Sequence, residues 1–310
     1  MSRQPPVQQP PPVQKLWLRY AKRGRGRFAS HRDFARAFER ALRRAGAPLA
    51  YSSGFTPHPR ISWANSVPTG AESESEYVAI GLAAVVDPAE LAAALNATLP
   101  PGFALLAARP AGANLMAELT HSAWEITFPV WENTLIAPAE ESSNPEAADL
   151  AADPKTAAGT DRPAPDTAQA DQPNLSPDPP LLDYRAAPSG LSPAWADRLT
   201  RAVAWFLAQP DVPVSRQTKR GRRQFDARGP VVSLTVEPSP DCPNRPGLRL
   251  VSRHTVPLVR PDDVVQALDG IDALDGIAPG LGADCLIRRT AQGRLVQGRV
   301  VDPLPGPPPA

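Results

Sequence analysis

One segment, residues 31–45, constrains the fold of this chain more than any other, because its apolar and charged side chains separate onto two faces of a helix. At about 100° per residue, the apolar stripe consists of Phe34, Phe38, Ala41, Leu42 and Ala45. The opposite face carries Arg32, Arg36, Arg40, Arg43 and Arg44. Ser30 is the expected N-cap, with Asp33 three residues on, and Gly46 and Pro48 end the helix. We therefore expect the apolar stripe to be buried and the arginine face to be exposed or bound.

The elements expected around this helix follow the order strand, helix, strand, strand, helix, strand. The strands are expected at residues 16–20, 61–64, 76–82 and 103–108, and the second helix at residues 87–95. This order is that of a ferredoxin-like (split βαβ) lobe, in which two helices cover one face of an antiparallel sheet. The other face of the sheet is then free for a ligand.

The second half of the sequence repeats this order of elements less clearly. Strands are expected at residues 124–130, 212–215, 224–225, 231–236, 248–252 and 285–288, and helices at residues 193–207 and 261–268. The sequence thus predicts an α+β protein with two ferredoxin-like lobes, at residues 15–115 and 120–300. Residues 1–14 and 301–310, both rich in proline, are expected to be disordered tails.

Residues 137–190 are rich in proline, alanine and acidic side chains, and we expect them to form a long disordered insertion in the second lobe. Ten acidic residues against two basic ones between positions 138 and 183 give this part a net charge of −8. Since the whole chain carries +1, the rest carries +9, which is compatible with a nucleic-acid partner. The insertion is either a weak competitor for the same basic surface or a solvating spacer.

The compartment is indicated by what the sequence lacks. Cys242 and Cys285 are far apart and outside any Cys-x-x-Cys motif, so neither a disulfide framework nor a zinc ribbon is expected. The N-terminal residues lack the apolar core of a signal peptide, and no apolar run approaches the length of a membrane span. We expect a cytoplasmic protein that binds no cofactor of its own.

Residues 22–27, with the sequence KRGRGR, connect the first strand to the helix. Glycine permits close approach of the backbone, and the cations together with the following helix N-terminus suit a phosphate group. A solvated turn is the alternative, because the spacing Gly-x-Gly alone is not specific. The expected anion-binding residues of this loop are Arg23, Arg25 and Arg27.

The arginine face of the helix is a second candidate for binding. Only Glu39 offers local pairing, so these arginines repel one another unless phosphates or an acidic protein approach. Arginine also contacts phosphate in a bidentate manner. The alternative is an ordinary solvated face. The expected RNA-binding residues here are Arg36, Arg40, Arg43 and Arg44.

Residues 50–60, AYSSGFTPHPR, form a loop too rich in proline and glycine for regular structure. The aromatic residues in and after it, Tyr51, Phe55 and Trp63, either stack on bases or pack into the core beneath the loop. The residues of this loop expected to bind RNA are Tyr51, Phe55, His58 and Arg60.

Two histidines, His31 and His58, are candidate catalytic residues because each lies beside a basic element rich in glycine or proline. Acid/base catalysis would require one of them to lie near a reacting group. The alternative is local hydrogen bonding by His31 and packing of His58 in a rigid loop. A metal site would need a third ligand, for which Asp33 and His121 are only guesses, so no metal site is predicted.

Three acidic residues alternate at the start of an expected strand: Glu72, Glu74 and Glu76. They could act as general acids or metal ligands. Alternation of charge at this place is explained more simply by a solvated sheet edge, and this is the interpretation that the sequence favours.

Residues 215–223, SRQTKRGRR, repeat the basic chemistry in the second lobe and resemble a hairpin with a basic tip. The cations of this tip are Arg216, Lys219, Arg220, Arg222 and Arg223. We expect them to line one groove together with the arginine face of the helix, wide enough for a polyanionic strand.

Several motifs carry a resemblance to a known family: RF-x-SH-x-D at 27–33, RRA at 43–45, AYS-x-GF-x-PHPR at 50–60, G-x-x-SE-x-EY at 70–77 and TK-x-G-x-x-x-FD-x-R at 218–228. They resemble the radical-SAM-linked protein family, a domain of unknown function found alone or fused behind a cobalamin-type radical SAM protein. Arg32 stands where a family member has leucine. The resemblance supplies no catalytic residues.

The resemblance implies a separate radical SAM partner that carries the iron–sulfur cluster, S-adenosylmethionine and cobalamin, because this chain has no Cys-x-x-x-Cys-x-x-Cys motif. Relatives are encoded near ribosomal-protein and ribonuclease E/G genes, which implies RNA. The expected function is therefore that of an accessory protein that binds tRNA or rRNA and presents it to this enzyme. The alternatives are a metal-independent endoribonuclease of duplicated ferredoxin-like fold that uses His31, and a protein-binding adaptor.

Overall fold

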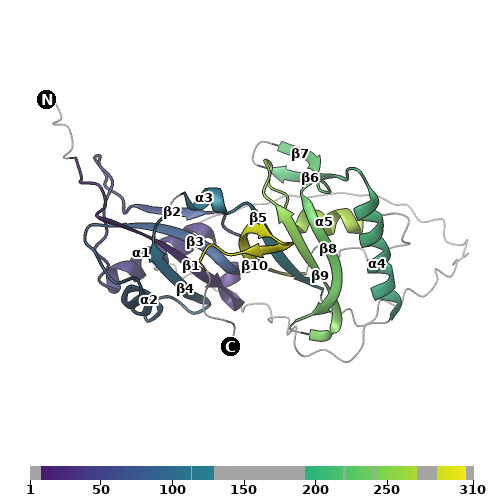
Figure 1. Ribbon diagram of the computed structural model, residues 1–310, viewed down its shortest axis with the longest axis horizontal. Coiled ribbons are helices and arrows are strands. Elements are labelled where there is room, and N and C mark those ends of the chain that lie inside the picture. Colours follow the sequence, from purple (N-terminus) through teal and green to yellow (C-terminus); the bar gives the residue numbers. More distant parts are fainter. Residues whose placement is uncertain are drawn as a thin grey trace, which may run out of the picture.

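The computed structural model describes residues 8–112, 114–128, 193–218, 221–240, 242–270 and 285–304. Within them the helices and strands form an α+β arrangement, which confirms the predicted fold class (Figure 1). The predicted insertion at 137–190 lies outside the described residues, as do Lys219 and Arg220 of the predicted basic tip. Residues 1–7 and 305–310 of the predicted tails lie outside them as well.

The first half of the chain contains the elements that the sequence predicts, in the predicted order. They are β1 (Gln14–Lys22), the 3-10 helix η1 (Gly24–Phe28), α1 (His31–Arg44), β2 (Ile61–Ala64), β3 (Glu72–Leu82), α2 (Pro88–Asn96) and β4 (Phe103–Pro110). Ser30 caps α1 as expected, since its hydroxyl oxygen accepts a hydrogen bond from the Asp33 backbone N–H. Asp87 caps α2 in the same way through Ala89 and Glu90.

The second half follows a short helix, α3 (Leu115–Glu118). Its elements are β5 (His121–Thr127), α4 (Pro193–Ala208), β6 (Pro213–Thr218), β7 (Gly221–Asp226), β8 (Val231–Ser239), β9 (Cys242–Arg253), α5 (Pro261–Asp269), β10 (Leu286–Val296) and β11 (Arg299–Val301). The strands β6 and β7 form a hairpin of their own, apart from the main sheet. This hairpin is inserted between α4 and β8.

The strands of the two halves form one nine-stranded sheet in the order β4-β1-β3-β10-β5-β9-β8, with β2 on β3 and β11 on β10. Within each half, neighbouring strands are antiparallel. The halves join where β10 pairs parallel to β3, at Arg288 opposite Glu72 and Arg289 opposite Ser73. The short strand β2 pairs only with residues 77–80 of β3, which leaves the start of β3 open to β10. We expected a separate sheet in each lobe, but the pairing of β10 with β3 joins the strands of both lobes into one sheet.

Each half has its own core, and one loop links the cores. In the first half, Phe34, Phe38 and Leu42 of α1 pack with β1, β3 and α2. In the second half, α4 and α5 pack on Trp124, Ile126 and Leu250 among other residues of the sheet. Val67 and Ala71 lie between β2 and β3 in sequence, yet they are buried in the core of the second half. The loop 65–71 therefore ties the two halves together by apolar burial as well.

The opposite face of the first half is covered in part. Trp17 and Tyr77 project from this face and pack with Leu115, Leu119 and Leu304, which come from α3 and from the end of the described chain. Asp302 accepts a hydrogen bond from the Tyr77 hydroxyl at 2.7 Å and pairs with Arg19 at 3.4 Å. The sheet face that a split βαβ lobe leaves open to a ligand is thus occupied here by the protein itself.

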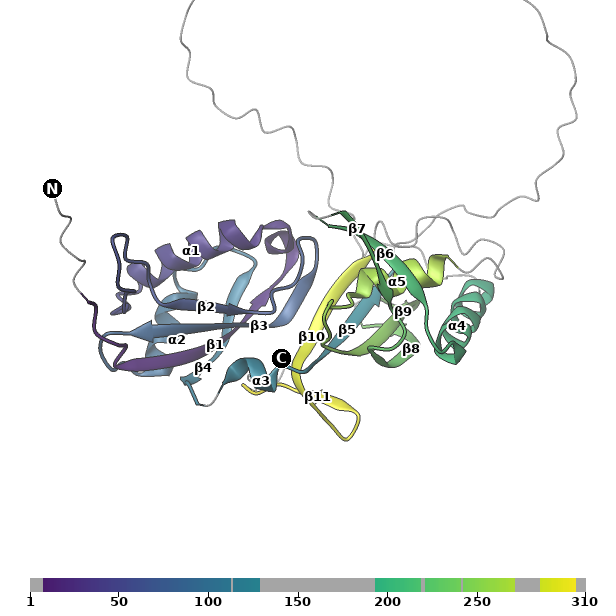
Figure 2. The ribbon, with the colours of Figure 1, turned by 90° about the horizontal axis from the view of Figure 1, so that it is seen from above.

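In Figure 2, α1 and the β6–β7 hairpin both lie towards the top of the picture, whereas in Figure 1 the hairpin lies above β2 and α1 lies below it. The free end of the hairpin points towards the half that carries α1, and Figure 1 shows the same direction. This arrangement is compatible with the predicted common groove. The groove itself stays a prediction.

His254 lies at the junction of the two halves. Its Nδ1 is 2.6 Å from the carbonyl oxygen of Leu119, and its Nε2 is 2.8 Å from the hydroxyl oxygen of Ser122. A neutral ring satisfies both contacts, because Nδ1–H donates to the carbonyl and Nε2 accepts from the hydroxyl. Burial lowers the pKa of His254 to about 4, although the Leu119 carbonyl acts in the opposite direction.

We predict that this histidine makes stability depend on pH. Between pH 6.5, the ordinary value, and about 4, the unfolded chain binds a proton at His254 that the folded chain does not. The free energy of unfolding should therefore fall by up to about 3 kcal/mol as the pH drops through this window. Urea unfolding of wild type and of His254→Asn, measured between pH 7 and pH 4.5, should show a flatter profile for the variant. His58→Asn is the control, since His58 is exposed; identical profiles for all three proteins would contradict the prediction.

Candidate nucleic-acid interface

The arginine face of α1 points away from the core. Because Phe34, Phe38 and Leu42 are buried, the opposite side of the helix is turned to solvent. The one ion pair on this face joins Arg43 to Glu39 at 3.8 Å, and an exposed pair of this kind contributes little. Among the residues that the structure describes, the guanidinium groups of four arginines on this face form neither an ion pair nor a hydrogen bond: Arg32, Arg36, Arg40 and Arg44.

The loop before α1 is held by acidic side chains and by packing. Arg23 makes a bidentate ion pair with Glu74, at 2.6 Å from Nε to Oε1 and 2.5 Å from Nη2 to Oε2, and this contact raises its pKa. The backbone N–H of Gly24 donates to Glu72. A Cβ on Gly26 would lie 2.9 Å from the carbonyl oxygen of Gly102, so glycine is needed there for packing. The predicted phosphate cradle is thus occupied by carboxylates of the protein.

The other two cations of this loop differ in their surroundings. Arg25 is exposed, whereas Arg27 is half-buried with its guanidinium 4.6 Å from the ring centre of Phe28. Phe28 itself is exposed. Arg25 is therefore the cation of this loop that is exposed and forms no ion pair among the described residues.

The aromatic residues of the following loop divide between core and surface. Trp63 contacts the rings of Tyr20, Phe34 and Phe38, so it packs in the core. Tyr51 packs partly against the same core, and its carbonyl oxygen accepts from Arg60 Nε at 3.0 Å. Phe55 is 70 % exposed and His58 is exposed. Phe55 is the aromatic side chain of this loop that is placed to meet a base.

Neither candidate catalytic histidine belongs to a cluster of possible metal ligands within the described residues. His31 is the first residue of α1; its ring meets Trp63 edge-on at 5.2 Å, and its Nδ1 is 3.3 Å from Ser66 Oγ. The guessed ligand His121 belongs to the second half, where Nδ1 is 2.9 Å from Thr120 Oγ. Within the described part of the chain, no group of three or more His, Cys, Asp or Glu side chains could hold a metal ion.

The acidic run of β3 is not the solvated edge that the sequence favoured. Glu72 pairs with Arg288 at 3.0 Å, Glu74 pairs with Arg23, and Glu76 pairs with Arg289. Glu76 is 1 % exposed and Arg289 is 2 % exposed. The interpretation as a solvated edge is wrong, because β10 pairs with the start of β3 and covers it with arginines.

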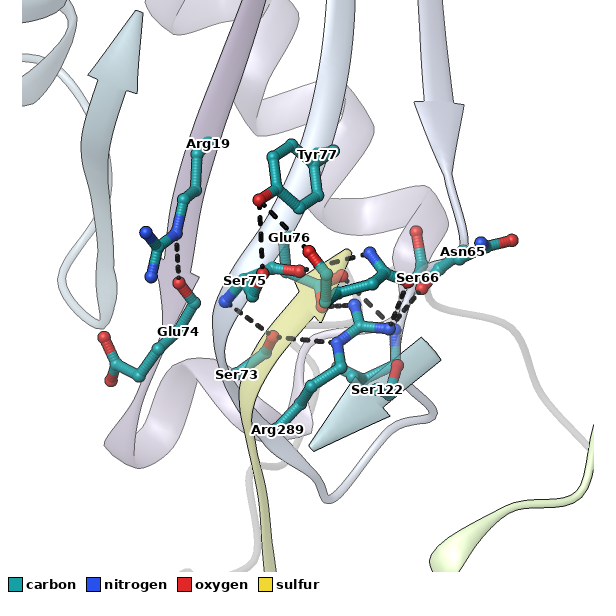
Figure 3. A network of polar contacts seen from close by, with 12 residues as sticks. Arg19, Asn65, Ser66, Ser73, Glu74, Ser75, Glu76, Tyr77, Ser122 and Arg289 are labelled. Carbon is teal, nitrogen blue, oxygen red and sulfur yellow. Dashed lines mark hydrogen bonds and ion pairs between the residues drawn. The ribbon is translucent and has the colours of Figure 1, made fainter. Parts of the chain in front are cut away.

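Figure 3 shows how Arg289 closes the junction. Its Nη1 donates to the carbonyl oxygen of Asn65 at 2.8 Å and to Gln292 Oε1 at 3.0 Å, and its Nη2 donates to Glu76. The guanidinium also lies 5.4 Å from the ring centre of Trp124. Arg288 and Arg289 were not among the predicted functional residues, and no local sequence pattern indicates their pairing, because Arg288 and Glu72 are 216 residues apart.

The second basic element is the β6–β7 hairpin. Arg216 and Arg223 are cross-strand partners, and Arg222 and Arg223 are exposed. Arg216 is held in place: Nη2 donates to the carbonyl oxygen of Leu258 at 2.9 Å and pairs with Asp263 at 3.2 Å. The guanidinium of Arg216 also lies 4.7 Å from the ring centre of Phe225. The hairpin therefore offers Arg222 and Arg223 to solvent and uses Arg216 to attach itself to α5.

One protein-family model matches most of the chain. The model of a family described as an uncharacterized protein conserved in bacteria (DUF2344) matches residues 15–261, from β1 to the start of α5. No curated protein matches the chain. Among the described residues, no helix has both the length and the apolar character that a membrane span needs.

We predict that the ion pair of Glu76 with Arg289 is far more important for stability than that of Glu74 with Arg23. Glu76→Gln leaves Arg289 buried without a counter-charge, which should lower the free energy of unfolding by about 3–5 kcal/mol. Glu74→Gln, the matched control, removes an exposed pair and should cost at most about 1 kcal/mol. Urea unfolding at pH 7 measures both. Equal losses would show that the junction does not depend on the buried pair.

Proposed function

The chain belongs to the uncharacterized bacterial family DUF2344, and from this premise we propose that it is an accessory protein that binds RNA. The observation that carries the proposal is the arginine face of α1, where Arg36, Arg40 and Arg44 have no counter-charge among the described residues. Several uncompensated cations on one helix are stable next to a polyanion.

The spacing of these arginines favours a polymer over a small anion. Arg36, Arg40 and Arg44 recur every four residues, so they are about 6 Å apart along the helix axis. A strand with regularly repeated phosphates can engage each of them in turn. Arginine adds bidentate hydrogen bonds to each such contact.

The fold supports placing RNA on the helix side. Four strands of the main sheet in each half lie in the same order, namely β4-β1-β3-β2 in the first half and β10-β5-β9-β8 in the second. Numbered along the chain, this order is fourth, first, third, second in both halves, which supports our description of two ferredoxin-like lobes. Related single-stranded RNA binders of this topology use the open sheet face. Here Trp17 and Tyr77 on that face are covered by α3 and Leu304. The face that carries α1 is therefore the proposed binding face of the first half, and the free end of the hairpin points towards this half.

The proposed partner is a cobalamin-type radical SAM enzyme, to which this chain presents tRNA or rRNA. The proposal is supported by the motifs at 27–33, 50–60, 70–77 and 218–228, which resemble the radical-SAM-linked family. Crosslinking in cells, followed by sequencing of the RNA and mass spectrometry of the proteins, tests it. We expect tRNA or rRNA together with a protein that contains Cys-x-x-x-Cys-x-x-Cys. Recovery of proteins alone, without RNA, would favour the adaptor function instead.

We predict that removal of two arginines from α1 weakens RNA binding and its dependence on salt. Arg36→Ala combined with Arg40→Ala should lower the slope of log K against log salt concentration by about 1.4, since each phosphate contact in a single strand contributes about 0.7. Titration of a fluorescent single-stranded RNA at several KCl concentrations measures this slope. Arg294→Ala combined with Arg299→Ala removes the same charge from β10 and β11 and should leave the slope nearly unchanged. An equal effect of both double variants would show that RNA binding depends only on the net charge of the protein and not on the arginine face of α1.

We also predict that the bound RNA stays intact. His31 is exposed at the start of α1 beside Ser66, so a role as acid or base would be accessible to a bound strand. Incubation of RNA with wild type and with His31→Ala, analysed on a denaturing gel, should show no cleavage by either. Cleavage by wild type that disappears in His31→Ala, with binding retained, would replace the accessory function by that of an endoribonuclease.

A further inference from the structure

A hollow of about 420 Å³ lies between the β6–β7 hairpin and the segment that leads into α5. Its lining consists of Arg216, Gln217, Thr218, Arg223, Phe225, Pro257, Leu258 and Arg260. Pockets that hold small ligands begin at about 300 Å³, so the space is sufficient for one small organic molecule.

The wall of this hollow is rigid on the side of Arg216. The guanidinium of Arg216 is clamped between the ring of Phe225, the carbonyl oxygen of Leu258 and the carboxylate of Asp263. Asp263 is buried, and its Oδ2 also accepts from the backbone N–H of Arg260 at 2.7 Å. The hairpin and the start of α5 are thereby fixed to each other.

The lining of the hollow is positively charged, since it contains three arginines and no acidic residue. Asp263 pairs with Arg216, and Asp262 and Asp263 also attract Arg260, but neither aspartate lines the space. Arg223 and Arg260 are exposed, and within the described residues their guanidinium groups form no ion pair. Two guanidinium groups at one opening suit a phosphate, which can accept bidentate hydrogen bonds from each.

The remaining wall is apolar. Leu258 is 39 % exposed, and Pro257 and Phe225 adjoin it in the lining. Exposed apolar side chains beside free cations match a ligand that joins a flat ring to a phosphate, since bases stack on apolar, aromatic and guanidinium surfaces. A free phosphate would use only half of this surface.

We propose that the hollow binds one phosphorylated nucleoside, with Arg223 and Arg260 on the phosphate and with Leu258 and the stacked pair of Arg216 and Phe225 against the base. The assignment rests on the proposed function in one respect, namely that the nucleotide belongs to the bound RNA. It adds Phe225, Leu258 and Arg260 to the interface, none of which is among the residues that the sequence predicts to bind RNA.

Calorimetric titration of the full chain with the four 5′-mononucleotides, with adenosine and with inorganic phosphate tests the pocket directly. We expect at least one mononucleotide to bind about tenfold more tightly than adenosine or inorganic phosphate, because only it engages both walls. Arg223→Ala and Arg260→Ala should each weaken this binding about tenfold. Arg253→Ala, an exposed arginine on β9 outside the hollow, is the control and should bind like wild type.

The outcomes separate the pocket from the proposed function. Equal binding of phosphate and mononucleotides, or equal behaviour of Arg260→Ala and Arg253→Ala, overturns the pocket, whereas RNA binding that depends on Arg36 and Arg40 would still stand. Mononucleotide binding without RNA binding keeps the pocket and overturns its assignment to RNA. Thermal unfolding of each variant confirms that the exposed substitutions leave the fold intact.

Discussion

The relative position of the two halves depends on the buried ion pair between Glu76 and Arg289. Backbone pairing at the junction is limited to Arg288 with Glu72 and Arg289 with Ser73, which is too short to fix a sheet by itself. Arg289 supplements it with hydrogen bonds to Asn65 and Gln292. Since an unpaired buried charge is very costly, these contacts form or fail together. The halves are therefore held in one orientation, with the free end of the hairpin pointing towards the half that carries α1 (Figure 2).

The arginines of this chain serve two different purposes, which their number in the sequence does not distinguish. Those beside β3 pair with carboxylates: Arg19, Arg23, Arg288 and Arg289. Arg288 and Arg289 among them hold the junction. Others face solvent and form no ion pair among the described residues, namely Arg36, Arg40 and Arg44 on α1 and Arg223 and Arg260 at the hollow. The acidic side chains that line β3 thus neutralise the arginines beside it, whereas most arginines of α1 keep their charge. A net charge close to zero is consistent with a strongly basic face for this reason.

Sequence patterns predicted the local elements well and the contacts between the halves poorly. Helix α1 ends at Arg44, one residue from the predicted end. The prediction was accurate because the apolar period and both capping signals lie within about 17 consecutive residues. The pairing of Glu72 with Arg288 spans 216 residues, and no local period records it. The acidic run of β3 therefore read as a solvated edge. The contact of Leu304 with Tyr77 is also absent from any local pattern, because the two residues are far apart in the sequence.

The attachment of the hairpin shows why its cations can act as a binding surface. An isolated two-stranded hairpin is marginally stable in water, and β6–β7 lies outside the main sheet. Arg216 compensates for this by joining the hairpin to Leu258 and Asp263. A ligand that meets Arg223 and Arg260 then finds the hairpin and the start of α5 already fixed to each other, so its binding has to order only the two exposed side chains. The paired Arg216 in this way positions the segments that carry the other two arginines.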